Sequence, residues 1–146
     1  MNGLENKYII KNNKRLRYGY TTGSCAAGAA SGAVRMLLSG RELSEVTLPT
    51  PKGITLTLAL HDITRGDNYV SCAVRKDAGD DPDTTNGILV YVKAEKICCR
   101  DSETDNCEDI GTGAGRPQII LDGGIGVGRV TKPGLSPVSY THLRAH

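Results

Sequence analysis

The densest group of side chains that could do chemistry lies within residues 75–87, Arg-Lys-Asp-Ala-Gly-Asp-Asp-Pro-Asp-Thr-Thr-Asn-Gly. Its four aspartates repel one another unless cations or backbone donors lie close, and Arg75 and Lys76 are the nearest candidates. Such a segment can bind a metal ion, hold a hydroxylated ligand or supply a general base. It lacks the spacing of an EF-hand, and a solvated acidic turn is the competing interpretation. The density of Gly, Pro and Asn favours a loop of defined shape.

A second candidate site lies in residues 16–27, Leu-Arg-Tyr-Gly-Tyr-Thr-Thr-Gly-Ser-Cys-Ala-Ala. A tight turn here leads into a predicted helix, whose first N–H groups and positive dipole end favour an anion such as a carboxylate. The residues at this entrance are Thr21, Thr22, Gly23 and Ser24. An ordinary helix cap is the competing interpretation.

The third segment is residues 122–134, Asp-Gly-Gly-Ile-Gly-Val-Gly-Arg-Val-Thr-Lys-Pro-Gly. Its glycines let the backbone approach a flat or bulky ligand closely; they are Gly123, Gly124, Gly126 and Gly128. Arg129 and Lys132 can pair with carboxylates there. The segment satisfies neither the dinucleotide fingerprint nor the P-loop pattern, so a nucleotide site would depend on glycine content alone. A glycine-rich hairpin is the alternative.

The cysteines do not predict a metal centre or a disulfide framework. There are five of them, an odd number, and no C-x-x-C pair. Cys25 lies near a helix start, where a thiolate is stabilised, but no histidine stands in an obvious partner segment. We therefore predict a packed thiol at Cys25. Cys98, Cys99 and Cys107 lack a fourth ligand at useful spacing, so no protein-bound metal is expected.

The elements that must position these segments are one helix and several strands. Alanine and leucine predict a helix over about residues 25–39, ended by Gly40. Its first half carries little side-chain bulk, which indicates that something packs closely against it. Alternation with period two predicts core-facing strand positions at Ile54, Leu56, Leu58 and Leu60, and at Val70, Cys72 and Val74. The strands expected are residues 8–10, 46–48, 54–61, 69–75, 88–94 and 119–121, with a turn at 64–68.

This element order predicts an α+β fold, a two-layer sandwich of a mixed or antiparallel sheet with one main Ala/Gly-rich helix. The length of 146 residues suits one domain, and the absence of Trp and Phe requires an aliphatic core. With 18 basic and 16 acidic residues, the chain lacks the dense basic face of a nucleic-acid binder. It shows no apolar run for a signal peptide or membrane helix, so we expect a cytoplasmic protein without a membrane partner.

Together the three segments resemble the CbiD family. The family shares Leu-Arg-x-Gly-x-Thr-Thr-Gly-x-Cys-Ala-Ala, matched at residues 16–27, and Lys-Asp-Ala-Gly-Asp-Asp-Pro-Asp-x-Thr-x-Gly, matched at 76–87. It also shares Gly-Gly-x-Gly-Val-Gly-x-Val-Thr-Lys-Pro-Gly-Leu, matched at 123–135. Three long motifs in the same order make chance improbable. The resemblance covers about residues 15–136.

The resemblance implies methyl transfer from S-adenosylmethionine to C1 of cobalt-precorrin-5B, giving cobalt-precorrin-6A in anaerobic cobalamin biosynthesis. The substrate is a tetrapyrrole macrocycle rimmed with acetate and propionate groups, and it carries the cobalt itself. Substrate-binding residues are then Arg17, Arg75, Arg129 and Lys132 together with Thr21, Thr22, Gly23 and Ser24. The glycines Gly123, Gly124, Gly126 and Gly128 would bind the methyl donor. A carboxylate from Asp77, Asp80 or Asp81 would take a proton or face the sulfonium.

The expected layout is a lead over residues 1–14, a CbiD-like N-terminal domain over 15–136, and a non-family tail over 137–146. Chains of the family are more than twice this long, so their C-terminal domain is missing and the tail is interpreted as foreign or frame-shifted. Transient contact with neighbouring corrin-pathway enzymes is a further expectation. The alternatives are an inactive fragment that at most binds a tetrapyrrole, a generic nucleotide-binding α/β domain, and a small calcium-binding module at the acidic loop.

Overall fold

The computed structural model describes residues 3–4, 6–80, 84–97, 119–129 and 143–145. The chain divides into two compact units, residues 1–97 and 98–146. The first contains one helix and seven strands among its described residues, and all of its strand pairs are antiparallel. The predicted α+β class is therefore confirmed.

The single helix, α1, spans Thr22–Ser39. Thr21 is its N-cap: the backbone there is extended and the side chain accepts a hydrogen bond from the Ser24 N–H at 3.0 Å. Gly40 ends the helix with a left-handed φ of 69°, as predicted. The helix begins three residues earlier than predicted, because Thr21 rather than a later hydroxyl residue caps it.

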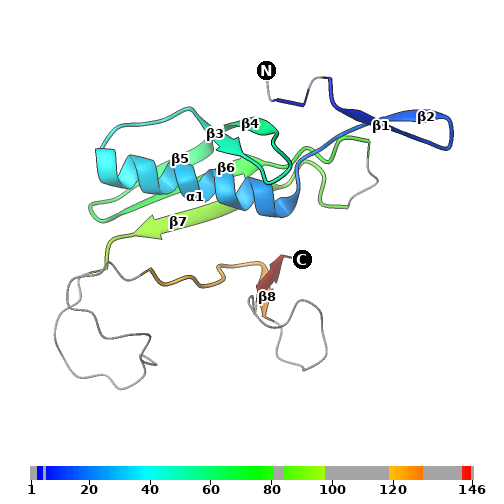
Figure 1. Cartoon of the computed structure of the whole chain (residues 1–146). Helices are drawn as coiled ribbons and strands as arrows, with labels where there is room; N and C mark the ends of the chain where they lie inside the picture. The colour runs from blue at the N-terminus through cyan, green and yellow to red at the C-terminus, as the bar shows by residue number, and fades with distance from the viewer. Residues whose placement is uncertain (1–2, 5, 81–83, 98–118, 130–142, 146) are drawn as a thin grey trace, which may run out of the picture. The chain divides into compact units, whose positions relative to one another are not determined.

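Two small sheets and a hairpin accompany the helix (Figure 1). β3 (Glu45–Pro49) pairs with β4 (Thr55–Ala59), and β6 (Tyr69–Arg75) is the central strand between β5 (His61–Arg65) and β7 (Leu89–Glu95). The predicted single strand over 54–61 is wrong. The chain changes sheets at Leu60, whose N–H bonds the Ser44 carbonyl at 2.8 Å.

The core lies between α1 and the strands, with the predicted faces turned inward. Leu56, Leu58 and Leu60 are buried, and so are Val70, Cys72 and Val74. The bulk-free half of α1 makes this possible: a Cβ added at Gly28 would lie 2.4 Å from Leu58 Cδ1, and one added at Gly32 would lie 2.6 Å from Leu60 Cδ1. The close neighbours of Gly28 and Gly32 are therefore Leu58 in β4 and Leu60 directly after it.

Residues 8–17 form a hairpin, where the sequence predicted only one strand. β1 (Tyr8–Lys11) pairs with β2 (Lys14–Arg17), and the connecting Asn12 and Asn13 take φ of 50° and 58°. Two successive positive φ angles are typical of a type I′ turn, whose twist suits a hairpin and which asparagine tolerates. The proposed boundary between residues 14 and 15 thus falls within β2.

The second unit has fewer described residues. β8 (Val127–Arg129) pairs antiparallel with β9 (Leu143–Ala145), and Gly126 takes φ 82° in the turn that the Val127 N–H closes on the Gly124 carbonyl. The strand predicted at 119–121 is absent, since these residues are irregular. Within the described residues, no helix has the length and apolarity needed to cross a membrane.

Candidate functional site

The segments 16–27 and 75–87 cross each other at two glycines. A Cβ added at Gly19 would lie 2.0 Å from the Ala78 carbonyl carbon, and one added at Gly79 would lie 2.4 Å from the Arg17 carbonyl oxygen. The Tyr20 N–H bonds the Asp77 carbonyl at 2.5 Å, and the Asp80 N–H bonds the Arg17 carbonyl at 3.2 Å. Only residues without a side chain permit this approach, so the two glycines hold the motifs together.

Side chains strengthen the crossing. The Arg17 guanidinium donates two hydrogen bonds to Asp77, Nη1 to Oδ2 at 2.8 Å and Nη2 to Oδ1 at 2.9 Å. The Arg17 N–H donates to Asp80 Oδ2 at 2.6 Å, and the Gly79 N–H donates to Asp77 Oδ1 at 2.9 Å. A guanidinium that donates two parallel hydrogen bonds to a carboxylate fixes the orientation of that carboxylate and neutralises its charge.

The candidate catalytic aspartates differ in their surroundings. Hydrogen bonding from the Arg17 side chain is the main cause that lowers the pKa of Asp77. Partial burial opposes this effect, and the hydrogen bond from the Gly79 N–H lowers the pKa a little further. Asp77 is therefore a poor proton acceptor and a structural anchor. Asp80 is exposed and lines the adjoining cleft, and Asp81 lies outside the described residues.

That cleft has a volume of about 710 Å³. One wall comes from the β1–β2 hairpin, through Ile9, Lys11 and Leu16; the floor is the crossing itself. The other wall includes Thr21 and Thr22 at the start of α1. The cleft thus collects two of the three segments that the sequence singled out.

The helix start offers donors to this cleft. Of the first four N–H groups of α1, Ser24 donates to the Thr21 side chain and Cys25 donates to the Thr21 carbonyl. Within the described residues, the N–H groups of Thr22 and Gly23 have no hydrogen-bond acceptor. Free first-turn donors at a positive helix end favour a carboxylate or another anion.

The expected balance of the acidic loop by Arg75 and Lys76 stays a prediction, because Asp81 and Asp83 lie outside the described residues. A further cation takes part among the residues that the structure describes. Arg17 neutralises Asp77, whereas Lys76 is buried at 5% exposure and its ammonium donates to Thr85 Oγ1 at 2.5 Å. Arg75 lines a separate, smaller cleft of about 270 Å³ with Glu45 and His61. The sequence suggested cations by proximity along the chain, and the fold adds one from 60 residues away.

The third segment belongs to the second unit, so the first unit's geometry does not include it. Gly123 donates its N–H to Asp122 Oδ1 at 2.8 Å. A Cβ at Gly124 or Gly126 would meet nothing within 4 Å among the described residues. Gly128 and Arg129 lie in β8, whereas Lys132 lies outside the described residues. Their binding roles therefore stay predictions.

The cysteines follow the sequence prediction where they are described. Cys25 is fully buried, and burial raises the pKa of its thiol to about 11, although the charge of Lys76 lowers it slightly. Cys72 is also buried and its thiol donates to the Ala29 carbonyl at 3.2 Å. Both are packed thiols. Among the described residues, no three His, Cys, Asp or Glu side chains are grouped to hold a metal ion. Cys98, Cys99 and Cys107 lie outside the described residues.

Sequence reasoning missed the hairpin wall of the cleft. Ile9, Lys11 and Leu16 fell partly in the supposed lead, and none was predicted to contact a ligand. A weak signal was present: Asn12-Asn13 stands between two short runs that could form strands, and asparagine tolerates the positive φ angles of a tight hairpin turn.

The Arg17–Asp77 ion pair predicts a pH dependence of stability. Because the pKa of Asp77 is lowered by folding, the stabilisation is complete above the unfolded value of about 3.9 and is lost as pH falls through the folded value. We expect Asp77→Asn to lower the free energy of unfolding at pH 7, measured in urea, and the deficit to shrink below about pH 4. Arg17→Gln should show the same profile, and the double variant should lose little more than either. A deficit independent of pH would contradict this role.

Residues 9–139 match the CbiD family, so the chain belongs to that family. Relatives similar to it are named cobalt-precorrin-5B C(1)-methyltransferase. The one from Ruminiclostridium cellulolyticum is 45% identical over 129 residues, covering 88% of this chain and 29% of the relative. The one from Thermoanaerobacter sp. is 47% identical over 128 residues, covering 88% and 30%.

A third relative of that name, from Alkaliphilus metalliredigens, is 48% identical over 129 residues, covering 88% of this chain and 30% of the relative. The chain therefore spans about 30% of the length of these relatives. No solved structure matches the chain.

Proposed function

We propose that this chain is the cleft-bearing N-terminal part of a cobalt-precorrin-5B C(1)-methyltransferase. The whole protein transfers a methyl group from S-adenosylmethionine to C1 of cobalt-precorrin-5B, giving cobalt-precorrin-6A in cobalamin biosynthesis. The observation that carries the proposal is the crossing at Gly19 and Gly79, because it joins two family motifs around one cleft. The names of the relatives supply the reaction.

The chemistry of the cleft suits a flat macrocycle with acidic substituents. The backbone at Gly19 and Ala78 carries almost no bulk, so a ring can lie close to it. The N–H groups of Thr22 and Gly23 at the positive end of α1 are suited to one of its carboxylates. Arg17 orients Asp77 and thereby the loop, and it leaves Asp80 at the cleft.

S-adenosylmethionine supplies an electrophilic methyl group on a cationic sulfonium. The glycines of residues 123–128 are our candidates for its binding, supported by the open space beside Gly124 and Gly126 within the described residues. Asp80 is the described carboxylate that we assign to proton transfer or to stabilisation of the sulfonium. Its exposure at the cleft supports that role, whereas Asp77 is held by Arg17. Methyl transfer depends on positioning the two reactants more than on a protein nucleophile.

The test is binding by the 146-residue chain and turnover by a complete relative. We expect cobyrinic acid, a corrin with free acetate and propionate groups, to bind the chain saturably, measured by the shift of its visible absorption. Methyl transfer, followed by mass spectrometry with cobalt-precorrin-5B, is expected only of the complete protein, because this chain spans about 30% of its relatives. A chain that leaves the corrin spectrum unchanged would contradict the proposed substrate cleft.

A further inference from the structure

We propose that the β1–β2 hairpin is a ligand-binding wall and that Lys11, supported by Lys14, binds a peripheral carboxylate of the ring. This inference deepens the proposed function and rests on it. It assigns a binding role to Lys11 and Lys14, which lie outside all three segments that the sequence singled out.

The hairpin has two faces of different character. Alternate residues share a face, so Ile9 and Lys11 stand opposite Leu16 and Lys14, in that order, on one side. Tyr8, Ile10, Arg15 and Arg17 form the other side. Three of the four residues of the first side, Ile9, Lys11 and Leu16, line the 710 Å³ cleft, whereas Arg17 at the base of the hairpin is the one residue of the other side that does so. We therefore take the first side as the one that faces the ligand.

The ligand-facing side pairs two like charges. Lys11 and Lys14 are direct cross-strand partners, and like charges in that position destabilise an antiparallel pair. Neither ammonium has an ion pair or a hydrogen bond within the described residues. A bound anion between or beside them would remove the repulsion, so this pair favours a carboxylate ligand.

The two arginines of the outer side are both engaged by other residues of the protein. The Arg15 guanidinium lies 3.5 Å from the centre of the Tyr8 ring, a cation–π contact. Arg17 is held by Asp77. Within the described residues, the cations of the hairpin thus divide into two arginines that are engaged by the protein and two lysines that are not, Lys11 in the lining of the cleft and Lys14 as its cross-strand partner.

The base of the hairpin is fixed to the crossing. The Tyr18 N–H bonds the Lys7 carbonyl at 3.1 Å, and Arg17 is anchored through Asp77 and Asp80. Lys11 lies near the turn of this hairpin, and the short pair of strands fixes its position relative to the crossing. Ile9 and Leu16 lie between the two, where they contact the apolar ring while Lys11 contacts its rim.

The test compares two charge reversals on the same hairpin. Lys11→Glu places a glutamate opposite Lys14, which relieves the repulsion, so melting should be unchanged or slightly higher. We expect its dissociation constant for cobyrinic acid to rise on the order of tenfold or more. Arg15→Glu makes the same change in net charge on the outer face, and its dissociation constant should stay within about threefold of the parent.

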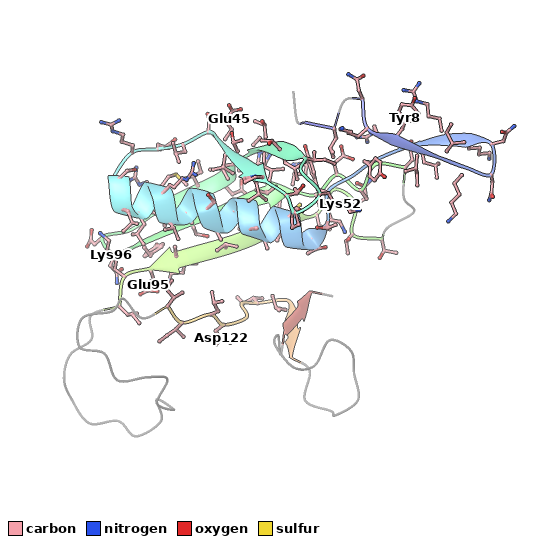
Figure 2. All side chains as sticks on the ribbon, in the orientation of Figure 1. Tyr8, Glu45, Lys52, Glu95, Lys96 and Asp122 are labelled. Carbon is pink, nitrogen blue, oxygen red and sulfur yellow. The ribbon has the colours of Figure 1, made fainter. Side chains whose placement is uncertain are left out.

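A second control is Lys96→Glu, an exposed lysine that lies at the far end of the unit from Tyr8 (Figure 2). Cobinamide, the same ring with its peripheral acids amidated, provides the ligand control. The parent chain should prefer cobyrinic acid to cobinamide, and Lys11→Glu should abolish that preference.

The outcomes separate the two proposals. If the parent binds cobyrinic acid and Lys11→Glu binds it equally well, the role of the hairpin is wrong and the cleft at the crossing stands. Equal losses in Lys11→Glu and Arg15→Glu would also overturn it, because general electrostatics would then explain both. If the parent binds neither ring, the proposed substrate cleft and the role of Lys11 are wrong together.

Discussion

Gly79→Ala is expected to cost the chain about 3 kcal/mol of its free energy of unfolding. Two penalties combine there. The residue takes φ 66°, which strains an alanine by about 1 kcal/mol. Its new Cβ would also lie 2.4 Å from the Arg17 carbonyl oxygen and 2.7 Å from the Tyr18 carbonyl carbon, and forcing these backbones apart costs about 2 kcal/mol.

Three other glycines make the measurement a complete set of controls. Gly53 takes φ 73° with open space around it, so Gly53→Ala should show the strain alone. Gly19 has the backbone clash without a positive φ, so Gly19→Ala should show the clash alone. Gly23 has neither, and Gly23→Ala within α1 should be neutral or stabilising.

In urea denaturation, Gly79→Ala and Gly19→Ala should therefore both lose more stability than Gly53→Ala, and Gly23→Ala should lose none. If Gly79→Ala and Gly53→Ala lose equal stability, the crossing is not tight in solution. The basis for a shared cleft would then disappear, since the crossing is what brings the motifs together.

Asp80→Asn is expected to lower methyl transfer by about two to four orders of magnitude in a complete family member that carries this motif. The substitution removes the charge that would accept a proton or face the sulfonium. The amide oxygen of asparagine can still accept the hydrogen bond that the Arg17 N–H gives at 2.6 Å, so the fold should persist. Single-turnover rates with cobalt-precorrin-5B, followed by mass spectrometry, measure the effect.

Asp77→Asn in the same complete protein is the matched comparison, because it removes a neighbouring carboxylate that the ion pair already occupies. It should lower the melting temperature more than Asp80→Asn does. Asp80→Asn should leave melting close to that of the parent while turnover falls. Unchanged turnover in Asp80→Asn would show that this residue is not part of the site. A decrease in both the melting temperature and the turnover would show that its role is structural.

The amino-acid sequence was sufficient for what depends on local pattern. The end of α1 at Gly40 follows from a residue that tolerates a left-handed backbone. The inward faces at Leu56, Leu58 and Leu60 follow from alternation, because a strand turns successive side chains to opposite sides. Three ordered motifs identified the family, and the packed state of Cys25 followed from the lack of a partner histidine.

Local pattern could not predict where strands end or which segments pair. Residues 54–61 alternate without a break, yet the chain leaves one sheet for another at Leu60, because β4 pairs with β3 and β5 pairs with β6, and these partners lie in different sheets. The hairpin at residues 8–17 depends on a turn of two asparagines, a weaker signal than Asn-Gly, and its strands are exposed rather than clearly alternating.

The sequence by itself determined the chemical inventory of this protein: the acidic loop, the helix entrance and the family to which both belong. Only the tertiary structure decided that Arg17, from 60 residues away, neutralises Asp77, and that Asp80 lines the same cleft as Lys11. The physical reason is that charge and periodicity are properties of a segment. The partner of a charge is fixed by where two backbones can touch, and here glycine at two distant positions permits that contact.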